Sequence, residues 1–316
     1  MTLDREILRS EHDVVELDLS QRRRISRLGS MLQNADLVFA WFASLHSALP
    51  VLAAAGLGKP SIVVVGGYDT ANMPEIGYGH MGHPIKRHIV RAICQAATVL
   101  VANSSTAATE VRRNVGASAR IEVIYHGFPS RPTSLPLQRE AIVLSVGNVN
   151  RENLRRKGHE LFVHAARLVP EARFILVGRP SDGAIGYLRS IAPGNAEFPN
   201  FVSQNDLDCL LERASVYVQA SEHEGFGCAV AEAMLAGCVP VVAARGALPE
   251  VVGEQGLYLE RLDAQSVAQA IRSALQTPGE RRPQIAARIA TRYPLEVRRR
   301  AILQLVADVG SHRSAG

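Results

Sequence analysis

Aromatic residues are scarce in this chain, and several kinds of segment are missing from it. Only 5% of the 316 residues are aromatic, and one is tryptophan. No stretch interleaves aromatic and basic residues as single-strand binders do, so we expect no nucleic-acid partner. No apolar run reaches the ~20 residues that span a bilayer. Asp4, Arg5 and Glu6 stand where a signal peptide would be apolar, so we expect no signal peptide.

Cysteine is also sparse and carries no metal or redox motif. The four cysteines have no C-x-x-C spacing. Each lies in an apolar context, which predicts buried free thiols in a reducing compartment and hence a cytoplasmic protein.

The composition is that of a globular protein with a mild excess of positive charge. Hydrophobic residues make up 47% and charged residues 21%, and the net charge is +5. The excess suits anionic ligands or an anionic membrane surface. The length is sufficient for two domains.

Apolar strand patterns alternate with helical patterns along the whole chain, which predicts α/β domains with parallel sheets covered on both faces. The proline-containing stretch 131–138 reads as a linker. We therefore expect a first Rossmann-like domain over 1–133 and a second over 139–293, facing a cleft that holds the ligand. Residues 294–316 should form a C-terminal helix and tail that packs back on the first domain, with Arg298 to Arg300 facing solvent. The expected strands are 14–19, 36–42, 61–65, 99–102, 121–125, 142–146, 174–177, 216–220, 240–243 and 257–259, and the expected helices include 22–32, 45–57, 85–97, 105–115, 158–168, 207–214, 228–236, 263–275 and 294–309.

The most informative stretch runs from Ser221 to Gly237 and reads SEHEGFGCAVAEAMLAG. It predicts a glycine turn after a buried strand, followed by a helix that ends at Gly237. The first N–H groups of a helix bind phosphate well, and Gly227 would let a phosphate approach them. Because Glu224 and Glu232 would repel the phosphate, they suit the hydroxyls on either side of it. By itself the turn fits an ordinary strand–turn–helix with two surface glutamates better than it fits a phosphate site.

A second candidate stretch, 145–158, follows the first strand of the second domain and is rich in cations. Arg151, Arg155, Arg156 and Lys157 fall within seven residues. They form either a solvated basic loop or a clamp on a diphosphate, and charge-assisted hydrogen bonds of this kind contribute ~1.5–3 kcal/mol each. Lys157, next to Gly158, is the best single candidate.

These motifs together resemble glycosyltransferase family 4, a family of retaining enzymes with the two-domain GT-B fold. The string S-x-x-E-G-F-G-x-x-x-x-E-A-M-x-x-G-x-P-V-V over 221–242 carries most of the resemblance. Val146-Gly147 with Lys157-Gly158 matches the family's V-G…K-G loop, and 248–253 matches its P-E-V-V-G segment. The resemblance extends over about 141–259 and is weaker before that.

The resemblance implies roles for the matching residues. Glu224 would contact the donor sugar, Glu232 the ribose, and Lys157 the diphosphate, with the turn around Phe226 for support. Asn148 stands where relatives often carry arginine, so Arg151, Arg155 or Arg156 would substitute, and we select Arg156, beside the lysine. The implied donor site comprises Gly147, Arg151, Arg156, Lys157, Glu224, Gly225, Phe226, Gly227 and Glu232.

The first half departs from the family pattern. Its opening residues resemble the helix that follows the first strand in relatives, so we expect a first domain that lacks its first strand, because the given sequence starts late or the domain is reduced. Relatives often carry a histidine at the end of a first-domain strand, where this chain has Gly66-Gly67-Tyr68-Asp69. Asp69 is therefore a candidate acceptor-side base, or else a turn aspartate. His46 is a second acceptor-side candidate, or else a helix-start histidine with a local partner.

Two basic clusters in the first half indicate a further property. Arg22 to Arg24 with Arg27 form one, and Lys86, Arg87 and Arg91, interleaved with isoleucine and valine, form the other. Basic amphipathic helices bind anionic membranes, although solvated helix faces give the same pattern.

The sequence thus predicts a retaining hexosyltransferase that moves a sugar from a nucleotide diphosphate sugar to a carbohydrate or lipid-linked acceptor in cell-surface polysaccharide or glycolipid synthesis. It would be cytoplasmic or peripheral on the inner membrane face. No cofactor is expected, and no metal, because cations and the helix neutralise the phosphate. The alternatives are a nucleotide-sugar epimerase of the same fold and a non-catalytic nucleotide-sugar-binding module.

Overall fold

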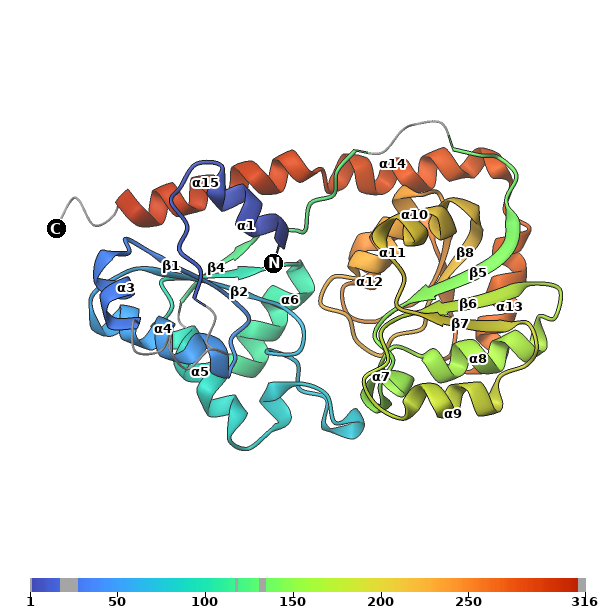
Figure 1. The fold of residues 1–316 in the computed structure, drawn as a ribbon, viewed down its shortest axis with the longest axis horizontal. Coiled ribbons are helices and arrows are strands. Elements are labelled where there is room, and N and C mark those ends of the chain that lie inside the picture. Colours follow the sequence, from blue (N-terminus) through green and yellow to red (C-terminus); the bar gives the residue numbers. More distant parts are fainter. Residues whose placement is uncertain (1, 18–27, 117–118, 131–134, 312–316) are drawn as a thin grey trace. The chain divides into compact units, whose positions relative to one another are not determined.

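A computed structural model describes residues 2–17, 28–116, 119–130 and 135–311 (Figure 1). The chain divides into two compact units. The first comprises Met1–Gly127 and Leu295–Gly316, and the second Phe128–Pro294. The first unit therefore ends at Gly127, before the predicted linker 131–138, of which 131–134 lie outside the described residues.

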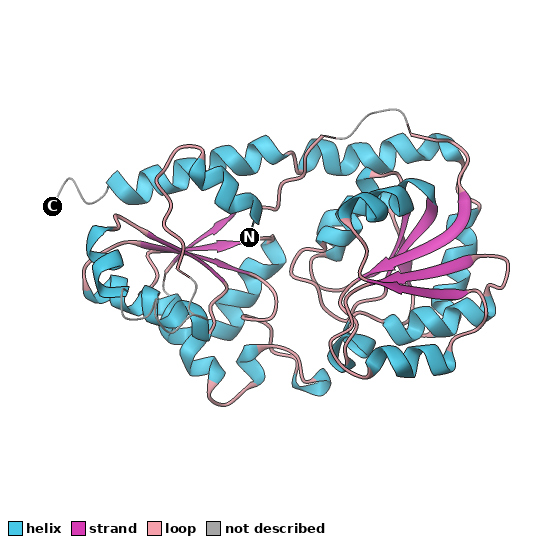
Figure 2. Ribbon diagram, in the orientation of Figure 1, coloured by secondary structure: helices cyan, strands magenta, loops and turns pink. Residues whose placement is uncertain are grey.

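The first unit contains a four-stranded parallel sheet in the order β1-β2-β3-β4. Every residue of β2, the apolar run Ser61–Val65, is buried, because helices cover both faces (Figure 2). The strands are β1 (Val38–Trp41), β2 (Ser61–Val65), β3 (Val99–Ala102) and β4 (Arg120–Val123). The helices are α1 (Thr2–Arg9), α3 (Leu28–Asn34), α4 (Leu45–Gly56), α5 (Lys86–Ala96), α6 (Ser105–Glu110), continued by the π-helical turn η3 (Val111–Val115), and α15 (Leu295–Ser311), with short turns η1 (Pro74–Ile76) and η2 (His80–Gly82).

Alternate residues of β2 belong to two different cores. Val63 and Val65 pack with α4, α5 and α6 on one face, whereas Ile62 and Val64 pack with α1 and α15 on the other. This separation follows from the two-residue period of a strand.

A buried ion pair joins the first and last helices of the first unit. Arg298 on α15 donates from Nε to Oδ1 of Asp4 on α1 at 2.6 Å, and both side chains are almost fully buried. Asp4 also accepts from Trp41 Nε1 at 3.0 Å, and Arg298 donates to the carbonyls of Ile124 and Tyr125. The prediction that Arg298 faces solvent is therefore wrong.

The second unit contains a six-stranded parallel sheet in the order β10-β9-β8-β5-β6-β7. Its strands are β5 (Glu140–Val146), β6 (Arg173–Val177), β7 (Ala196–Asn200), β8 (Ala214–Gln219), β9 (Val239–Ala243) and β10 (Leu257–Leu259). Its helices are α7 (Arg151–Arg156), α8 (His159–Leu168), α9 (Ala184–Ile191), α10 (Gln204–Arg213), α11 (Cys228–Leu235), α12 (Leu248–Val252), α13 (Ala264–Leu275) and α14 (Arg282–Arg292), with turns η4 (Gly253–Gln255) and η5 (Gly279–Arg281). Asp263 caps α13 by accepting from the Ser266 N–H. Among the described helices none has the length and apolar character to cross a bilayer.

Some sequence predictions of elements are wrong. Residues 14–17 of the predicted strand 14–19 form no strand. Glu16 in this segment pairs with arginines of α1, including Arg9 at 2.6 Å. Residues 18 and 19 lie outside the described residues. The structure describes the helix predicted over 22–32 only from residue 28. The cluster of Arg22 to Arg24 with Arg27 therefore lies outside the described residues. Strand β7 escaped prediction because it contains Pro199, which suits a sheet edge. Cys209 is exposed, contrary to expectation.

Candidate functional site

The candidate site of the second unit lies where two adjacent strands end. Strands β5 and β8 pair in parallel, with Val143 opposite Val216. The loops that follow them therefore meet at the same edge of the sheet, where ligands bind in open α/β sheets. One loop carries the predicted cations and the other carries Glu224.

Glycines bring the cationic loop close to the end of β8. A Cβ on Gly158 would come within 2.4 Å of the Ala220 carbonyl oxygen, and its φ of +70° favours glycine. A Cβ on Gly147 would lie 2.8 Å from Cδ of Lys157, so the lysine side chain runs across that glycine. Asn150 caps α7 by accepting from the Asn153 N–H at 2.8 Å, so residues Arg151–Arg156 of the predicted basic loop are helical.

The glycine turn before α11 is held from both sides. Gly227 caps the helix with φ +99°, and the Phe226 ring packs between Phe128 and Tyr293 at centroid distances of 6.0 and 5.2 Å. Gly246 packs directly against the turn, since a Cβ there would lie 2.4 Å from the Glu224 carbonyl oxygen. These contacts within the protein fix the backbone of the turn.

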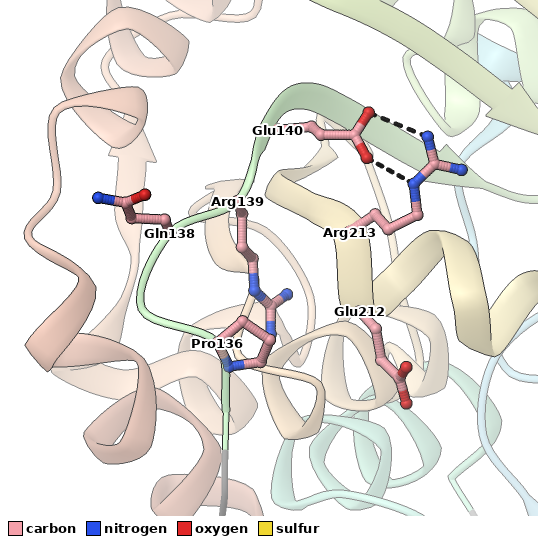
Figure 3. Close-up of a pocket in the computed structure, with 6 residues that line it drawn as sticks. All are labelled: Pro136, Gln138, Arg139, Glu140, Glu212 and Arg213. Atoms are coloured by element: carbon pink, nitrogen blue, oxygen red, sulfur yellow. Dashed lines mark hydrogen bonds and ion pairs between the residues drawn. The ribbon is translucent and has the colours of Figure 1, made fainter.

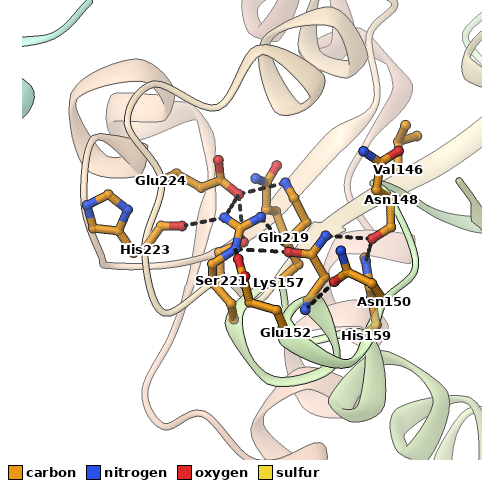
Figure 4. A network of polar contacts seen from close by, with 12 residues as sticks. Val146, Asn148, Asn150, Glu152, Lys157, His159, Gln219, Ser221, His223 and Glu224 are labelled. Atoms are coloured by element: carbon orange, nitrogen blue, oxygen red, sulfur yellow. Dashed lines mark hydrogen bonds and ion pairs between the residues drawn. The ribbon is translucent and has the colours of Figure 1, made fainter. Parts of the chain in front are cut away.

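Lys157 and Glu224 form the centre of a polar network (Figure 4). Lys157 Nζ donates to Glu224 Oε1 at 2.9 Å, and the two side chains are 17% and 12% exposed. Ser221 Oγ donates to the same oxygen at 3.1 Å. Arg156 Nη1 lies 3.8 Å from it. The loop cations and the turn carboxylate, 67 residues apart, therefore form one site.

Arg156 is the predicted arginine that joins this network. It is buried, and its Nε and Nη2 donate to Asn153 Oδ1 at 3.0 and 2.6 Å. Arg151 is exposed at the start of α7, where its N–H bonds to Asp182. Arg155 is exposed too. Of the three arginines considered, Arg156 is the one beside Lys157 and Glu224.

The surroundings shift the pKa values of two buried groups in the network, Glu224 and His159. Burial alone would raise the pKa of Glu224, but Lys157 and Arg156 outweigh it and hold that pKa below its ordinary value. Burial, reinforced by Lys157, lowers the pKa of His159 to about 3. His159 is therefore neutral, and its Nε2 lies 3.3 Å from the Asn148 carbonyl oxygen.

Glu232 lies on α11 within electrostatic range of the same strand end. Burial, together with the charges of Glu224 and Glu232, raises the pKa of Tyr217 on β8. Both carboxylates thus act on one buried phenol. The Tyr217 hydroxyl lies 3.4 Å from Gln219 Oε1.

Several residues of the network were not predicted from the sequence. Gln219 hydrogen-bonds Glu224, and Asn153 orients Arg156 as described above. A polar residue within a fully buried strand is unusual, so Gln219 carried a signal. Ser221, the first letter of the signature string, carried another. Gly246 had no local signal, because its role depends on the backbone of the distant Glu224.

The acceptor-side candidates belong to the first unit. Asp69 is 1% exposed and accepts from the N–H groups of Ala43, Gly66 and Thr70 at 3.1 to 3.2 Å. Burial raises its pKa to about 6, against the effect of those hydrogen bonds. These hydrogen bonds connect the backbone before α4 with the turn after β2, which is a structural role for Asp69.

His46 is exposed, and both of its ring nitrogens have local partners. Nδ1 lies 2.7 Å from Ser44 Oγ and Nε2 lies 2.8 Å from the Trp41 carbonyl oxygen. These contacts fit the helix-start alternative better than the acceptor-side role.

A separate hollow of about 310 Å³ in the second unit lies at the start of β5 and the end of α10 (Figure 3). It is lined by Pro136, Gln138, Arg139, Glu140, Glu212 and Arg213. Arg213 forms a two-pronged pair with Glu140 at 2.6 and 2.9 Å. Because it adjoins the start of β5, it is distinct from the network at the strand ends.

Comparison with known families agrees with the geometry in both units. The model of "Glycosyltransferase Family 4" matches residues 9–130, and that of "Glycosyl transferases group 1" matches 140–277. The chain belongs to glycosyltransferase family 4. It is 37% identical over 89 residues to O-antigen chain mannosyltransferase B of Escherichia coli, a match that covers 28% of this chain and 23% of that relative.

Solved structures of similar fold cover nearly the whole family 4 chain. The Anabaena HepE protein in complex with UDP and glucose matches with a TM-score of 0.74 and 19% identity, over 96% of this chain and 88% of that one. Sucrose-phosphate synthase from Thermosynechococcus elongatus matches with a TM-score of 0.72 and 19% identity, over 96% and 86%. The fold is GT-B, with two Rossmann-like domains.

Proposed function

We propose that this chain is a retaining hexosyltransferase that transfers a sugar from a nucleotide diphosphate sugar to a carbohydrate or lipid-linked acceptor. The observation that carries the proposal is the contact of Lys157 with Glu224 beside the Gly227 turn. It brings a cation, a carboxylate and a helix N-terminus together, as a diphosphate flanked by hydroxyls requires.

Each group has a distinct part in the proposed reaction. Lys157 has three N–H donors, so it can keep one on Glu224 and turn another toward a phosphate oxygen. Arg156 adds positive charge from a position fixed by Asn153. Charge that develops on the leaving diphosphate would be stabilised without rearrangement of the site. Glu224 would hold sugar hydroxyls and Glu232 the ribose.

The comparisons guide the choice of donors. A matched relative is named a mannosyltransferase, and a structure of similar fold was solved with UDP-glucose. We therefore propose mannose and glucose nucleotides as the first donors to test. A role in cell-surface polysaccharide or glycolipid synthesis, at the cytoplasmic side of the membrane, is part of the same proposal.

The test measures the release of UDP from UDP-glucose and of GDP from GDP-mannose, with and without a panel of glycan and lipid-linked acceptors. We expect release that depends on the acceptor, and a product whose anomeric configuration matches that of the donor. Epimerised donor without release would contradict the proposal and favour the epimerase. Binding of the donor with neither transfer to any acceptor nor hydrolysis would favour the non-catalytic binding module.

A further inference from the structure

Gln219 is a polar residue inside the buried sheet of the second unit. Every residue of β8 is buried, and Gln219, the last residue of that strand, is 4% exposed. Strand β8 lies between β9 and β5, with Val242 of β9 opposite Gln219. An amide in such a place costs free energy unless it is hydrogen-bonded. The partners of the amide therefore indicate what the glutamine does there.

The Gln219 amide has two partners, and they fix its orientation. Gln219 hydrogen-bonds the carboxylate of Glu224, which lies beside it (Figure 4). An ionised carboxylate only accepts hydrogen bonds, so the amide nitrogen faces Glu224. The amide oxygen then faces Tyr217, whose hydroxyl donates to Gln219 Oε1 at 3.4 Å. Tyr217 and Gln219 are two positions apart on one strand and therefore share a face of the sheet.

The Glu224 carboxylate receives hydrogen bonds from a loop, from its own turn and from the strand. Lys157 Nζ and Ser221 Oγ both donate to Oε1, at 2.9 and 3.1 Å, and Gln219 adds a hydrogen bond from the end of β8. A carboxylate offers about four acceptor positions, so capacity remains for a sugar hydroxyl. Lys157 would also serve the diphosphate. Gln219, which belongs to the sheet, is a neutral donor that can stay on Glu224 throughout.

We propose that Gln219 is a positioning residue, which holds the Glu224 carboxylate toward the hydroxyls of the donor sugar and so favours recognition of the sugar over the nucleotide alone. The inference rests on the proposed function, in which Glu224 contacts the sugar. A carboxylate that is held from a strand loses little freedom when a hydroxyl binds to it. Because the carboxylate is buried, a donor without that hydroxyl leaves an acceptor unpaired and binds less well.

The first test compares each nucleotide sugar with its own nucleotide, UDP-glucose with UDP and GDP-mannose with GDP, by calorimetry on the full chain. Gln219→Leu should lower the affinity for the nucleotide sugar roughly tenfold, the value of one hydrogen bond to a charged group, and change that for the nucleotide by less than about twofold. The variant should also raise the pKa of Glu224, because burial, which raises that pKa, then acts against one hydrogen bond fewer. NMR titration measures this pKa without any nucleotide.

Gln219→Glu gives a readout that a purely structural role would not move. When protonated, the new carboxyl can donate its O–H to Glu224 as the amide does, and when ionised it repels Glu224. The titratable groups that face this pair are Lys157, Arg156, His159, Tyr217 and Glu232. Relative to the parent protein at each pH, the variant should bind the nucleotide sugar almost normally at about pH 5 and weakly at about pH 8. Gln219→Leu should stay weak throughout.

The matched control is Ser215→Ala, at a buried polar residue of the same strand. Ser215 is 5% exposed, and its Oγ donates to the Glu140 carbonyl oxygen at 2.7 Å. Alternation along β8 places it on the same face of the sheet as Gln219. This variant also loses a buried hydrogen bond, so its free energy of unfolding should fall. Its nucleotide sugar affinity and its Glu224 pKa should equal those of the parent protein, and circular dichroism checks that all variants are folded.

Three results would overturn the proposal. They are an unchanged nucleotide sugar affinity in Gln219→Leu, an equal loss of affinity for nucleotide and nucleotide sugar in that variant, and an equally strong loss in Ser215→Ala. An unchanged Glu224 pKa in Gln219→Leu would overturn this inference alone. Failure of the parent protein to bind either nucleotide sugar would count against the proposed function, and the Glu224 pKa would still decide between the two roles of Gln219.

Discussion

Lys157 Nζ and Glu224 Oε1 are 2.9 Å apart, and each side chain is less than one-fifth exposed. The pair connects the loop after β5 with the turn after β8. A site whose charges are already held in place loses less free energy on binding a diphosphate sugar.

Replacing Lys157 with Met should raise the pKa of Glu224, because burial then acts with less opposing charge. With its lowered pKa, Glu224 stabilises the parent protein fully above its unfolded value of 4.5, and that stabilisation is lost as the pH falls through the lower folded value. The variant should therefore lose stability at a higher pH. Denaturation measured across about pH 3 to 7 gives the stability of both proteins. NMR titration of the Glu224 carboxyl gives its pKa. An unchanged Glu224 pKa would contradict the account.

Donor binding should depend on both ends of the predicted site. Lys157→Ala and Glu232→Ala should each weaken donor binding by ~10–100-fold, the value of one lost charge-assisted hydrogen bond. Glu254 is exposed on the turn η4, so Glu254→Ala is the matched control and should bind normally. Calorimetry with the donor that supports transfer measures these affinities. Normal binding by both site variants would remove the site assignment.

The Gly246→Ala variant should disturb the site without touching a polar side chain. Its Cβ would meet the Glu224 backbone at 2.4 Å, and its φ is +54°. We expect a loss of roughly 1–3 kcal/mol in unfolding free energy and weaker donor binding. Gly194→Ala, which meets nothing within 4 Å, should be neutral or slightly stabilising. Thermal denaturation and donor titration report the two effects, and equal behaviour of the two variants would contradict the close contact.

The Asp69→Asn variant separates the structural and catalytic roles of that residue. The folded pKa of about 6 lies above 3.8, so Asp69 makes the parent protein less stable as the pH rises from about 3.8 to 6, by roughly 3 kcal/mol. The variant should lack that slope and keep its kcat within about tenfold, because backbone N–H groups occupy the carboxylate. A thousandfold loss of kcat at unchanged Tm would restore the role of acceptor-side base.

Arg298→Met should destabilise the first unit by about 3–5 kcal/mol, because Asp4 would keep a buried charge without its cation. Arg300→Met, exposed on the same helix, should change the stability by less than ~0.5 kcal/mol. The single tryptophan, Trp41, donates to Asp4 and so reports the unfolding of this unit by fluorescence. Equal stability of the two variants would show that the pair contributes little.

Transfer should persist after metal removal. Lys157, Arg156 and the N-terminus of α11 supply the positive charge that a divalent ion would otherwise provide. We expect donor turnover to remain within about twofold when EDTA is added, and addition of magnesium to change little. Loss of turnover with EDTA and its recovery with magnesium would contradict the metal-independent mechanism.

Local sequence alone determined much of the architecture. Alternating apolar patterns predicted parallel α/β sheets, and the string from Ser221 to Val242 identified the family. Gly227 and Gly237 were predicted at the two ends of α11, because backbone constraints at a helix end act within a few residues. Such features depend on neighbours in sequence, so a single chain reveals them.

Tertiary structure decided which distant residues meet. It placed Arg156, rather than Arg151 or Arg155, beside Glu224, and it paired Arg298 with Asp4 across 294 positions. It also left the leucines of α4 exposed, where the sequence showed only an apolar helix. Hydrophobic periodicity shows which face of a helix is apolar, but which charged groups lie together depends on chain packing over long sequence separations.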